Sequence, residues 1–186
     1  MNIATMKSSS KQFNVKQKTL NELQSYFSDI KFEDHSLAHL DDKEYRSCEL
    51  AYPSHYEYYP RVEEIISNYF EYINYNYFQY NLNDYLEIQL IRYTAGGNYK
   101  WHCDYAGQEL SNDSVRKLSL SLQLSDPKEY EGGELELINW SGSHFNMDKE
   151  YSAAIIFDSR TPHKAHHVTS GTRLVLVSWA YGPELT

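Results

Sequence analysis

The order of hydrophobic and polar residues divides the chain into a helical first part and a strand-rich second part. After Pro60, hydrophobic residues recur at the spacing of one helix face, which predicts a helix over 61–78. A shorter and weaker pattern favours a helix over 20–30. The polar residues 1–19 predict a loose or extended lead-in, and the pattern assigns no ordered element to residues 31–59.

Beyond residue 84, hydrophobic and polar residues alternate, as expected for strands whose two faces meet different surroundings. The clearest example is 118–124, where four leucines alternate with Ser119, Ser121 and Gln123. Further strands are expected at 86–90, 134–138, 153–157 and 173–179. Helices followed by many short strands predict a mainly β fold with N-terminal helices. Packed on those helices, the strands are expected to form a β-sandwich or a jelly roll, that is, a double-stranded β-helix.

The alternation also assigns directions to side chains in the jelly roll. We expect the leucine face of 118–124 to pack on the helices and its polar face to point toward a cavity. A barrel interior is apolar when it is only structural, whereas a polar interior suits a bound polar cofactor. The face of the last strand that should look into the same cavity carries Arg173, Val175, Val177 and Trp179.

The bulk properties narrow the class of protein. The 186 residues contain no internal repeat and predict a single domain over 1–186, with the jelly roll at 84–183. A formal net charge of −9 makes a nucleic-acid partner unlikely, because phosphate backbones attract basic surfaces. No apolar run is long enough for a membrane span or a signal peptide, so we expect a cytoplasmic protein. Two cysteines do not suggest a disulfide framework.

The candidate chemistry centres on His102 and Asp104. Residues two apart on a strand point to the same side, so this imidazole and carboxylate can face one metal ion, while Cys103 points away. His163 could supply a third ligand, in competition with His55, His144, His166 and His167. Two histidines and one carboxylate form the donor set of non-haem Fe(II) oxygenases. Arg173 could bind a carboxylate bidentately, as a 2-oxoglutarate-dependent oxygenase requires.

Together these motifs resemble the prolyl 4-hydroxylase superfamily of Fe(II)/2-oxoglutarate dioxygenases, including its PKHD-type members of bacteria and phages. The resemblance covers about Tyr93 to Pro183. It rests on the H-x-D pair, the turn SDPKEYEGGEL at 125–135, the distal histidine, the Gly171-x-Arg173 pair and Trp179. It implies Fe(II) as the metal, 2-oxoglutarate as the cosubstrate and dioxygen as the co-reactant, and it leaves ascorbate open as a further cofactor.

The resemblance also implies roles for individual residues. The metal ligands would be His102, Asp104 and His163, because the spacing from His163 to Gly171 and Arg173 fits the family whereas that from His166 or His167 does not. Arg173 would bind the distal carboxylate of 2-oxoglutarate. The same cosubstrate pocket would include Tyr93 and Gln123, the latter at a position where the family often has tyrosine.

Substrate contacts are implied for Tyr99, Arg116 and Trp179, which match positions that touch the peptidyl proline in collagen-type enzymes. The competing interpretations are core packing for the two aromatic residues and a surface ion pair for Arg116. Asp158 is interpreted as a turn residue and not as a fourth ligand. Because the iron would perform the oxidation, no protein residue beyond the metal ligands is expected to act as an acid or base.

The predicted function is therefore Fe(II)- and 2-oxoglutarate-dependent hydroxylation of a prolyl residue in a protein or peptide. The negative net charge favours a target that is neutral or basic around the proline. The alternative is hydroxylation of a free amino acid or small metabolite. Repair of alkylated nucleic acid is disfavoured by the charge and by the position of Arg173. A non-catalytic binding module is disfavoured by the intact triad. The sequence does not indicate an oligomeric state.

Overall fold

A computed structural model describes residues 9–34, 45–83, 86–105 and 114–183. The helices are α1 (Gln17–Phe27) and α2 (Tyr59–Ile73), with a 3₁₀ turn at Pro53–His55 and a π-helical turn at Asn74–Phe78. The strands are β1 (Ser10–Asn14), β2 (Glu33–Asp34), β3 (Arg46–Ser47), β4 (Glu49–Ala51), β5 (Leu86–Tyr93), β6 (Asn98–His102), β7 (Ser114–Gln123), β8 (Tyr130–Gly132), β9 (Leu135–Ile138), β10 (His144–Asn146), β11 (Ala153–Asp158), β12 (His163–Ala165), β13 (Val168–Gly171) and β14 (Arg173–Pro183). None of the helices in the described part has the length and apolar character to cross a bilayer.

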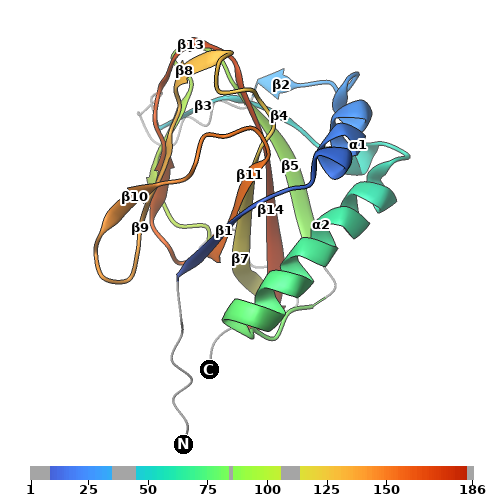
Figure 1. The fold of residues 1–186 in the computed structure, drawn as a ribbon, viewed down its shortest axis with the longest axis vertical. Helices are drawn as coiled ribbons and strands as arrows, with labels where there is room; N and C mark the ends of the chain where they lie inside the picture. The colour runs from blue at the N-terminus through green and yellow to red at the C-terminus, as the bar shows by residue number, and fades with distance from the viewer. Residues whose placement is uncertain (1–8, 35–44, 84–85, 106–113, 184–186) are drawn as a thin grey trace, which may run out of the picture.

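The predicted layers are confirmed. The major sheet has the strand order β1-β11-β7-β14-β5-β4-β2, and the minor sheet has the order β10-β9-β12-β6-β3. A third sheet pairs β13 with β8. In Figure 1 the two helices lie against one face of the major sheet, and the minor sheet lies on its other side. This arrangement is a jelly roll packed on helices.

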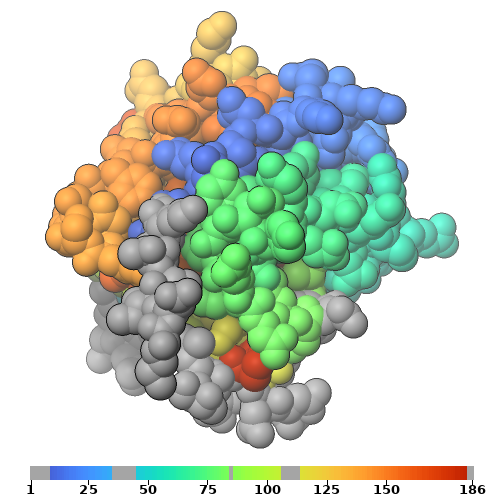
Figure 2. Space-filling model, turned by 60° about the horizontal axis from the view of Figure 1, so that its bottom comes forward, coloured from blue at the N-terminus to red at the C-terminus, as the bar shows by residue number. Residues whose placement is uncertain are grey.

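The helices form where the hydrophobic spacing predicts them. The predicted 61–78 is covered by α2 and the π-helical turn that follows it, and Pro60 lies in the first turn of α2, where a missing N–H leaves no helix bond unmade. The helix α1 begins and ends three residues before the predicted 20–30 and buries Leu20, Leu23 and Phe27. Figure 2 shows the surface of α2 bordered by the segment that holds β1 and α1.

The two faces of β7 also behave as predicted. Its leucines, with Leu124, share one hydrophobic core with the buried residues of α1 and α2. On the opposite face Ser119 and Ser121 are buried although they are polar. A buried hydroxyl needs a partner, so this face must meet other polar groups.

In the described part of the predicted lead-in, the extended alternative holds over β1, although the strand is not free but part of a sheet. β1 pairs antiparallel with β11, with Ser10 opposite Phe157, and forms the edge of the major sheet. The apolar strand β11 would otherwise be exposed as an edge with unpaired backbone groups. The backbone groups of β11 can pair with a neighbouring strand whatever side chains that strand carries. A strand of mostly polar residues, such as β1, can therefore cover this edge.

Within 31–59, the stretch that the sequence left without an order, the described residues 46–51 connect the two sheets. β3 pairs with β6 in the minor sheet, and β4 pairs with β5 in the major sheet. The chain therefore crosses from one sheet to the other at Cys48. This crossing places Arg46 at the edge of the space between the sheets.

Two glycines allow the strands β8 and β13 to approach closely. Gly132 and Gly171 have φ of +72° and +73°. A Cβ at Gly171 would lie 2.0 Å from the carbonyl oxygen of Glu129, and one at Gly132 would lie 2.2 Å from that of His167. Only glycine fits these positions in the β8–β13 pair.

Gly171→Ala should therefore lower the free energy of unfolding more than Gly142→Ala. Gly142 has a φ of +80° but nothing within 4 Å of an added Cβ, so it bears only the left-handed cost of about 1–2 kcal/mol. Gly171→Ala must also displace backbone, which adds ~1–3 kcal/mol. Urea unfolding of the two variants measures the difference. Equal losses would show that the β8–β13 contact is not close packed.

Candidate metal centre and its cavity

A cavity lies between the major and minor sheets, and residues from both line it. The major sheet contributes β5, β7, β11 and β14, and the minor sheet contributes β3, β6, β9 and β12. The predicted inward face of the last strand is confirmed. The lining includes Arg173, Val175, Val177 and Trp179.

Three potential ligands converge in this cavity. His102 ends β6, His163 begins β12, and the two are direct partners in the β6–β12 pair. The Nε2 atoms of His102 and His163 lie 3.7 Å and 3.5 Å from the two carboxylate oxygens of Asp104. The three ligand atoms all lie within 4.8 Å of one another. One ion can therefore meet all three side chains.

Each histidine is oriented by the same local contact. The Nδ1 atom of His102 lies 2.7 Å from the carbonyl oxygen of Lys100, and that of His163 lies 2.9 Å from the carbonyl oxygen of Thr161. A backbone carbonyl only accepts, so Nδ1 carries the proton and Nε2 keeps a free lone pair toward Asp104. Burial, together with the neighbouring His163, lowers the pKa of His102 to about 3, so this imidazole is neutral.

The carboxylate of Asp104 is fixed by hydroxyl groups. Ser119 Oγ donates to Asp104 Oδ2 at 2.7 Å, and Ser159 Oγ lies 2.9 Å from Ser119 Oγ. Burial by itself would raise the pKa of Asp104, but the two histidines, Ser119 and Trp179 outweigh it and lower that pKa. An ionised carboxylate beside two imidazole nitrogens is a donor set that suits Fe(II) and other divalent transition metals.

His102 and Asp104 face the same side as predicted, but they do not both lie on a strand. β6 ends at His102, so Asp104 lies in the bend that follows and not on the strand. Its backbone N–H donates to the carbonyl oxygen of Ser159, which holds the bend in place. As expected, Cys103 points elsewhere, and its thiol contacts the carbonyl oxygen of Arg160.

A β-bulge brings Tyr99 to the same side as His102. In the β6–β12 pair His163 is opposite His102, but Ala165 is opposite Tyr99, so β6 has one extra residue. Regular alternation would place side chains three residues apart on opposite faces. Instead both rings face the cavity and stack with centroids 3.6 Å apart.

The competing histidines lie outside the cavity. His166 Nε2 and His144 Nδ1 each lie 2.6 Å from an oxygen of Glu136. Neither they nor His55 and His167 belong to the cavity lining. Asp158 ends the strand β11, where Arg160 in the following turn holds it by an ion pair, and it does not line the cavity, in agreement with its exclusion as a fourth ligand.

Arg173 and Tyr93 face the cavity from neighbouring strands. They are direct partners in the β14–β5 pair, and the guanidinium carbon lies 5.7 Å from the centre of the phenol ring. Arg173 is buried, and no carboxylate pairs with it among the described residues. Burial raises the pKa of Tyr93, so its hydroxyl keeps its proton. Both groups can bind an acidic ligand.

Gln123 does not line the cavity beside Arg173 and Tyr93. It is absent from the cavity lining, and its Nε2 donates to the hydroxyl of Tyr130 at 2.8 Å. The contact of Gln123 with a cosubstrate therefore stays a prediction. The sequence could not show the hydrogen bond to Tyr130, because Tyr130 belongs to another strand.

The three predicted substrate contacts do line the cavity. Arg116 Nη2 donates to Glu87 Oε2 at 2.6 Å, and its guanidinium lies 4.0 Å from the centre of the Trp179 ring. The ion pair anticipated for Arg116 thus exists, but it is largely buried and not on the surface. Burial raises the pKa of Tyr99 to about 12, so that phenol is also neutral.

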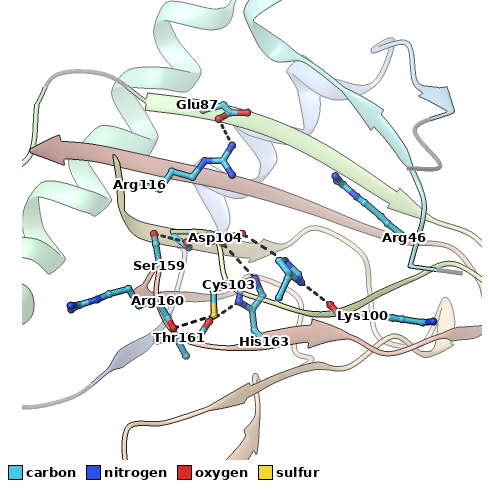
Figure 3. A network of polar contacts seen from close by, with 12 residues as sticks. Arg46, Glu87, Lys100, Cys103, Asp104, Arg116, Ser159, Arg160, Thr161 and His163 are labelled. Carbon is cyan, nitrogen blue, oxygen red and sulfur yellow. Dashed lines mark hydrogen bonds and ion pairs between the residues drawn. The ribbon is translucent and has the colours of Figure 1, made fainter. Parts of the chain in front are cut away.

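Sequence reasoning missed Arg46 and Glu87. Arg46 is only 8% exposed and lines the cavity from β3. Figure 3 shows Arg46 on one side of the space in front of Asp104 and the Glu87–Arg116 pair on the other. The alternation of β5 could have indicated that Glu87 faces inward with Gln89. No periodicity could have indicated Arg46, because its strand has two residues.

Comparison with known proteins identifies the family. A family profile described as "2OG-Fe(II) oxygenase superfamily" matches residues 88–181, about half of the chain. The chain belongs to this superfamily. Its members are named for Fe(II) and 2-oxoglutarate, and the donor set of the centre fits that metal.

The similar curated proteins are PKHD-type hydroxylases. The one from Stenotrophomonas maltophilia strain R551-3 is 36% identical over 97 residues, which are 51% of this chain and 43% of that protein. The one from Colwellia psychrerythraea is 40% identical over 88 residues, which are 46% and 38% of the two chains. The chain thus covers less than half the length of these relatives.

Solved structures show the same fold. A prolyl-4-hydroxylase from Pseudomonas putida superposes on this protein with a TM-score of 0.71 at 17% sequence identity. The match covers 93% of this chain and 92% of the chain of that enzyme. A prolyl hydroxylase from Trichoplax adhaerens, in complex with a hypoxia inducible factor peptide fragment, has the same TM-score and identity and covers 94% and 84%. These likenesses confirm the jelly roll that the sequence predicted.

Ser119→Ala should weaken divalent metal binding by about 10- to 100-fold, because Asp104 loses the hydroxyl that fixes it. The matched control is Ser178→Ala, on the neighbouring strand β14. Ser178 is fully buried and its hydroxyl has no partner in the described part of the chain. Titration with Co(II) compares the two variants. Equal metal affinity in both would mean that Ser119 does not position the carboxylate.

Proposed function

We propose that this protein is an Fe(II)- and 2-oxoglutarate-dependent hydroxylase. His102, Asp104 and His163 hold the iron, and Arg173 with Tyr93 binds the distal carboxylate of 2-oxoglutarate. The observation that carries the proposal is the convergence of three metal-binding atoms in one cavity with a buried, unpaired Arg173. When bound, iron and 2-oxoglutarate would supply the oxidising power for hydroxylation with dioxygen.

The residues of the chain position the reactants and limit water. Each histidine offers Nε2 because its Nδ1 proton is held by a backbone carbonyl. The side chains of Val175 and Val177 form an apolar wall next to Arg173, which strengthens a charge pair formed there. No proton transfer by a protein side chain is needed in this scheme.

The substrate we propose is a prolyl residue in a protein or peptide. Tyr99 and Trp179 present aromatic surface to the cavity, which suits an apolar ring such as the pyrrolidine of proline. Arg116, oriented by Glu87, still faces the cavity and can donate to a carbonyl oxygen. The names of the curated and structural relatives support the same class of substrate. The alternative remains a free amino acid or small metabolite.

Arg173→Ala should weaken 2-oxoglutarate binding by roughly thirty-fold or more, while the metal still binds. The reason is that truncating one partner of a buried charge pair costs about 2–5 kcal/mol. Calorimetric titration of the metal-loaded protein measures the change. The matched control is Arg92→Ala, because Arg92 is paired with Glu49 and is not part of the cavity lining. Unchanged cosubstrate affinity in the Arg173 variant would remove it from this role.

A proline-containing peptide library should yield products that carry one added oxygen atom on proline, when incubated with enzyme, Fe(II) and 2-oxoglutarate. Mass spectrometry locates the oxygen. Trp179→Ala should lower peptide-coupled succinate formation more than uncoupled succinate formation. The control is Trp140→Ala, an indole that is 50% exposed on the β9–β10 hairpin. If free amino acids stimulate turnover and peptides never do, the small-metabolite alternative replaces the peptidyl one.

A further inference from the structure

Arg46 is a buried cation in the cavity to which no role has been given. Its Nε donates to Cys48 Sγ at 3.2 Å, and its guanidinium carbon lies 4.8 Å from the centre of the Tyr99 ring. Figure 3 shows the guanidinium directed from β3 into the space in front of the metal ligands. Among the described residues, no carboxylate pairs with it.

The three arginines of the cavity differ in how their charges are balanced. Arg116 is neutralised by Glu87 at 2.6 Å. Under the proposed function, the distal carboxylate of 2-oxoglutarate neutralises Arg173. Only Arg46 keeps an unbalanced charge. A buried charge is costly unless an opposite charge or several hydrogen bonds compensate it, and a sulfur atom and an aromatic face compensate it weakly.

The other charges at the metal centre provide no negative charge to balance Arg46. The charges of a bound dication, Asp104, the two carboxylates of 2-oxoglutarate and Arg173 cancel one another. The cavity therefore stays one positive charge in excess when metal and cosubstrate are bound. Among the described residues that line the cavity, Asp104 is the only carboxylate, so the negative charge that balances Arg46 can come from the substrate.

The position of Arg46 fixes where that negative charge must be. Its guanidinium lies over Tyr99, and Tyr99 stacks on His102, whose Nε2 faces Asp104. One aromatic ring thus separates the guanidinium from a metal ligand. An anion bound by Arg46 would therefore lie next to Tyr99, in the same cavity as the metal ligands.

We propose that Arg46 binds a carboxylate of the substrate, next to the carbon that is hydroxylated. The inference rests on the proposed function, because it assigns Arg173 to 2-oxoglutarate. Among the described residues, neither terminal nitrogen of Arg46 has a hydrogen-bond partner, so both can make the two-pronged contact that a guanidinium offers to a carboxylate. A neutral carbonyl oxygen would accept one hydrogen bond but leave the charge unbalanced.

This proposal changes the expectation drawn from the net charge. A formal charge of −9 favours a neutral or basic target at long range. Inside the cavity the local excess is positive, and contact distances decide which group is bound. The carboxylate could be the α-carboxylate of a free or C-terminal residue, or an acidic side chain beside the target residue.

The test uses acid and amide forms of the same small probes. Zn(II)-loaded protein with saturating 2-oxoglutarate is titrated calorimetrically with N-acetylproline, N-acetylprolinamide, N-acetylalanine and N-acetylalaninamide. In the unmodified protein the acids should bind roughly thirty-fold or more tightly than the amides. Arg46→Met should abolish this preference, and Arg46→Lys should retain part of it. Arg61→Met, which changes an exposed arginine of α2, should leave the preference intact.

A second pair of probes identifies the source of the carboxylate. N-acetyl-Glu-Pro-amide is compared with N-acetyl-Gln-Pro-amide. An Arg46-dependent preference for the glutamyl form assigns the contact to an acidic side chain, and a preference confined to N-acetylproline assigns it to the α-carboxylate. Either result supports the proposal.

Three outcomes would overturn it. Amides that bind as tightly as acids remove the carboxylate contact. A preference that survives in Arg46→Met assigns that contact to another cation. A loss of 2-oxoglutarate affinity in Arg46→Met equal to that in Arg173→Ala places Arg46 in the cosubstrate site. Failure of the proposed function gives different results. If the protein does not use 2-oxoglutarate, 2-oxoglutarate itself does not bind. If the substrate is not a prolyl residue, the alanine probes show the preference for the acid form and the proline probes do not bind.

Discussion

The pairing of β6 with β12 is the constraint on which the rest of the centre depends. It sets His102 directly opposite His163 although the two are far apart in the sequence. Both strands are short, so the backbone bonds between them cannot be the whole support. The neighbours β9 and β3 flank the pair on either side and complete the minor sheet. A metal ion bound by both histidines would bind only the folded state and so stabilise this sheet.

Irregular backbone positions the cavity side chains as much as regular strands do. The bulge in β6 turns Tyr99 to the same side as His102, and the bend after β6 swings Asp104 toward both imidazoles. Hydroxyl groups of Ser119 and Ser159 then secure the carboxylate. Because these polar groups are buried and satisfied, the ligands are held in place before any ion arrives.

The cavity has an electrostatic character opposite to that of the whole chain. The guanidinium groups of two buried arginines, Arg46 and Arg173, and of the partly buried Arg116 line the cavity with one carboxylate–histidine cluster, inside a protein with a formal charge of −9. Each guanidinium meets a different partner. Glu87 neutralises the charge of Arg116. In our proposals, a carboxylate of the cosubstrate neutralises Arg173 and an anionic group of the substrate neutralises Arg46. Average charge therefore describes the surface, whereas selection of ligands depends on groups within a few ångströms.

The chain's own pattern was enough to predict the helix α2 and the inward face of β14, because both follow from periodicity, a local property of the chain. The jelly roll and the three residues that converge in the cavity were predicted with the help of a resemblance to a known family. The tertiary structure was needed to show that β1 joins the major sheet, that Gln123 contacts Tyr130 and that Arg46 lines the cavity. Each of these depends on a partner distant in sequence, and backbone pairing or a single buried contact leaves no periodic signal in the residues that make it.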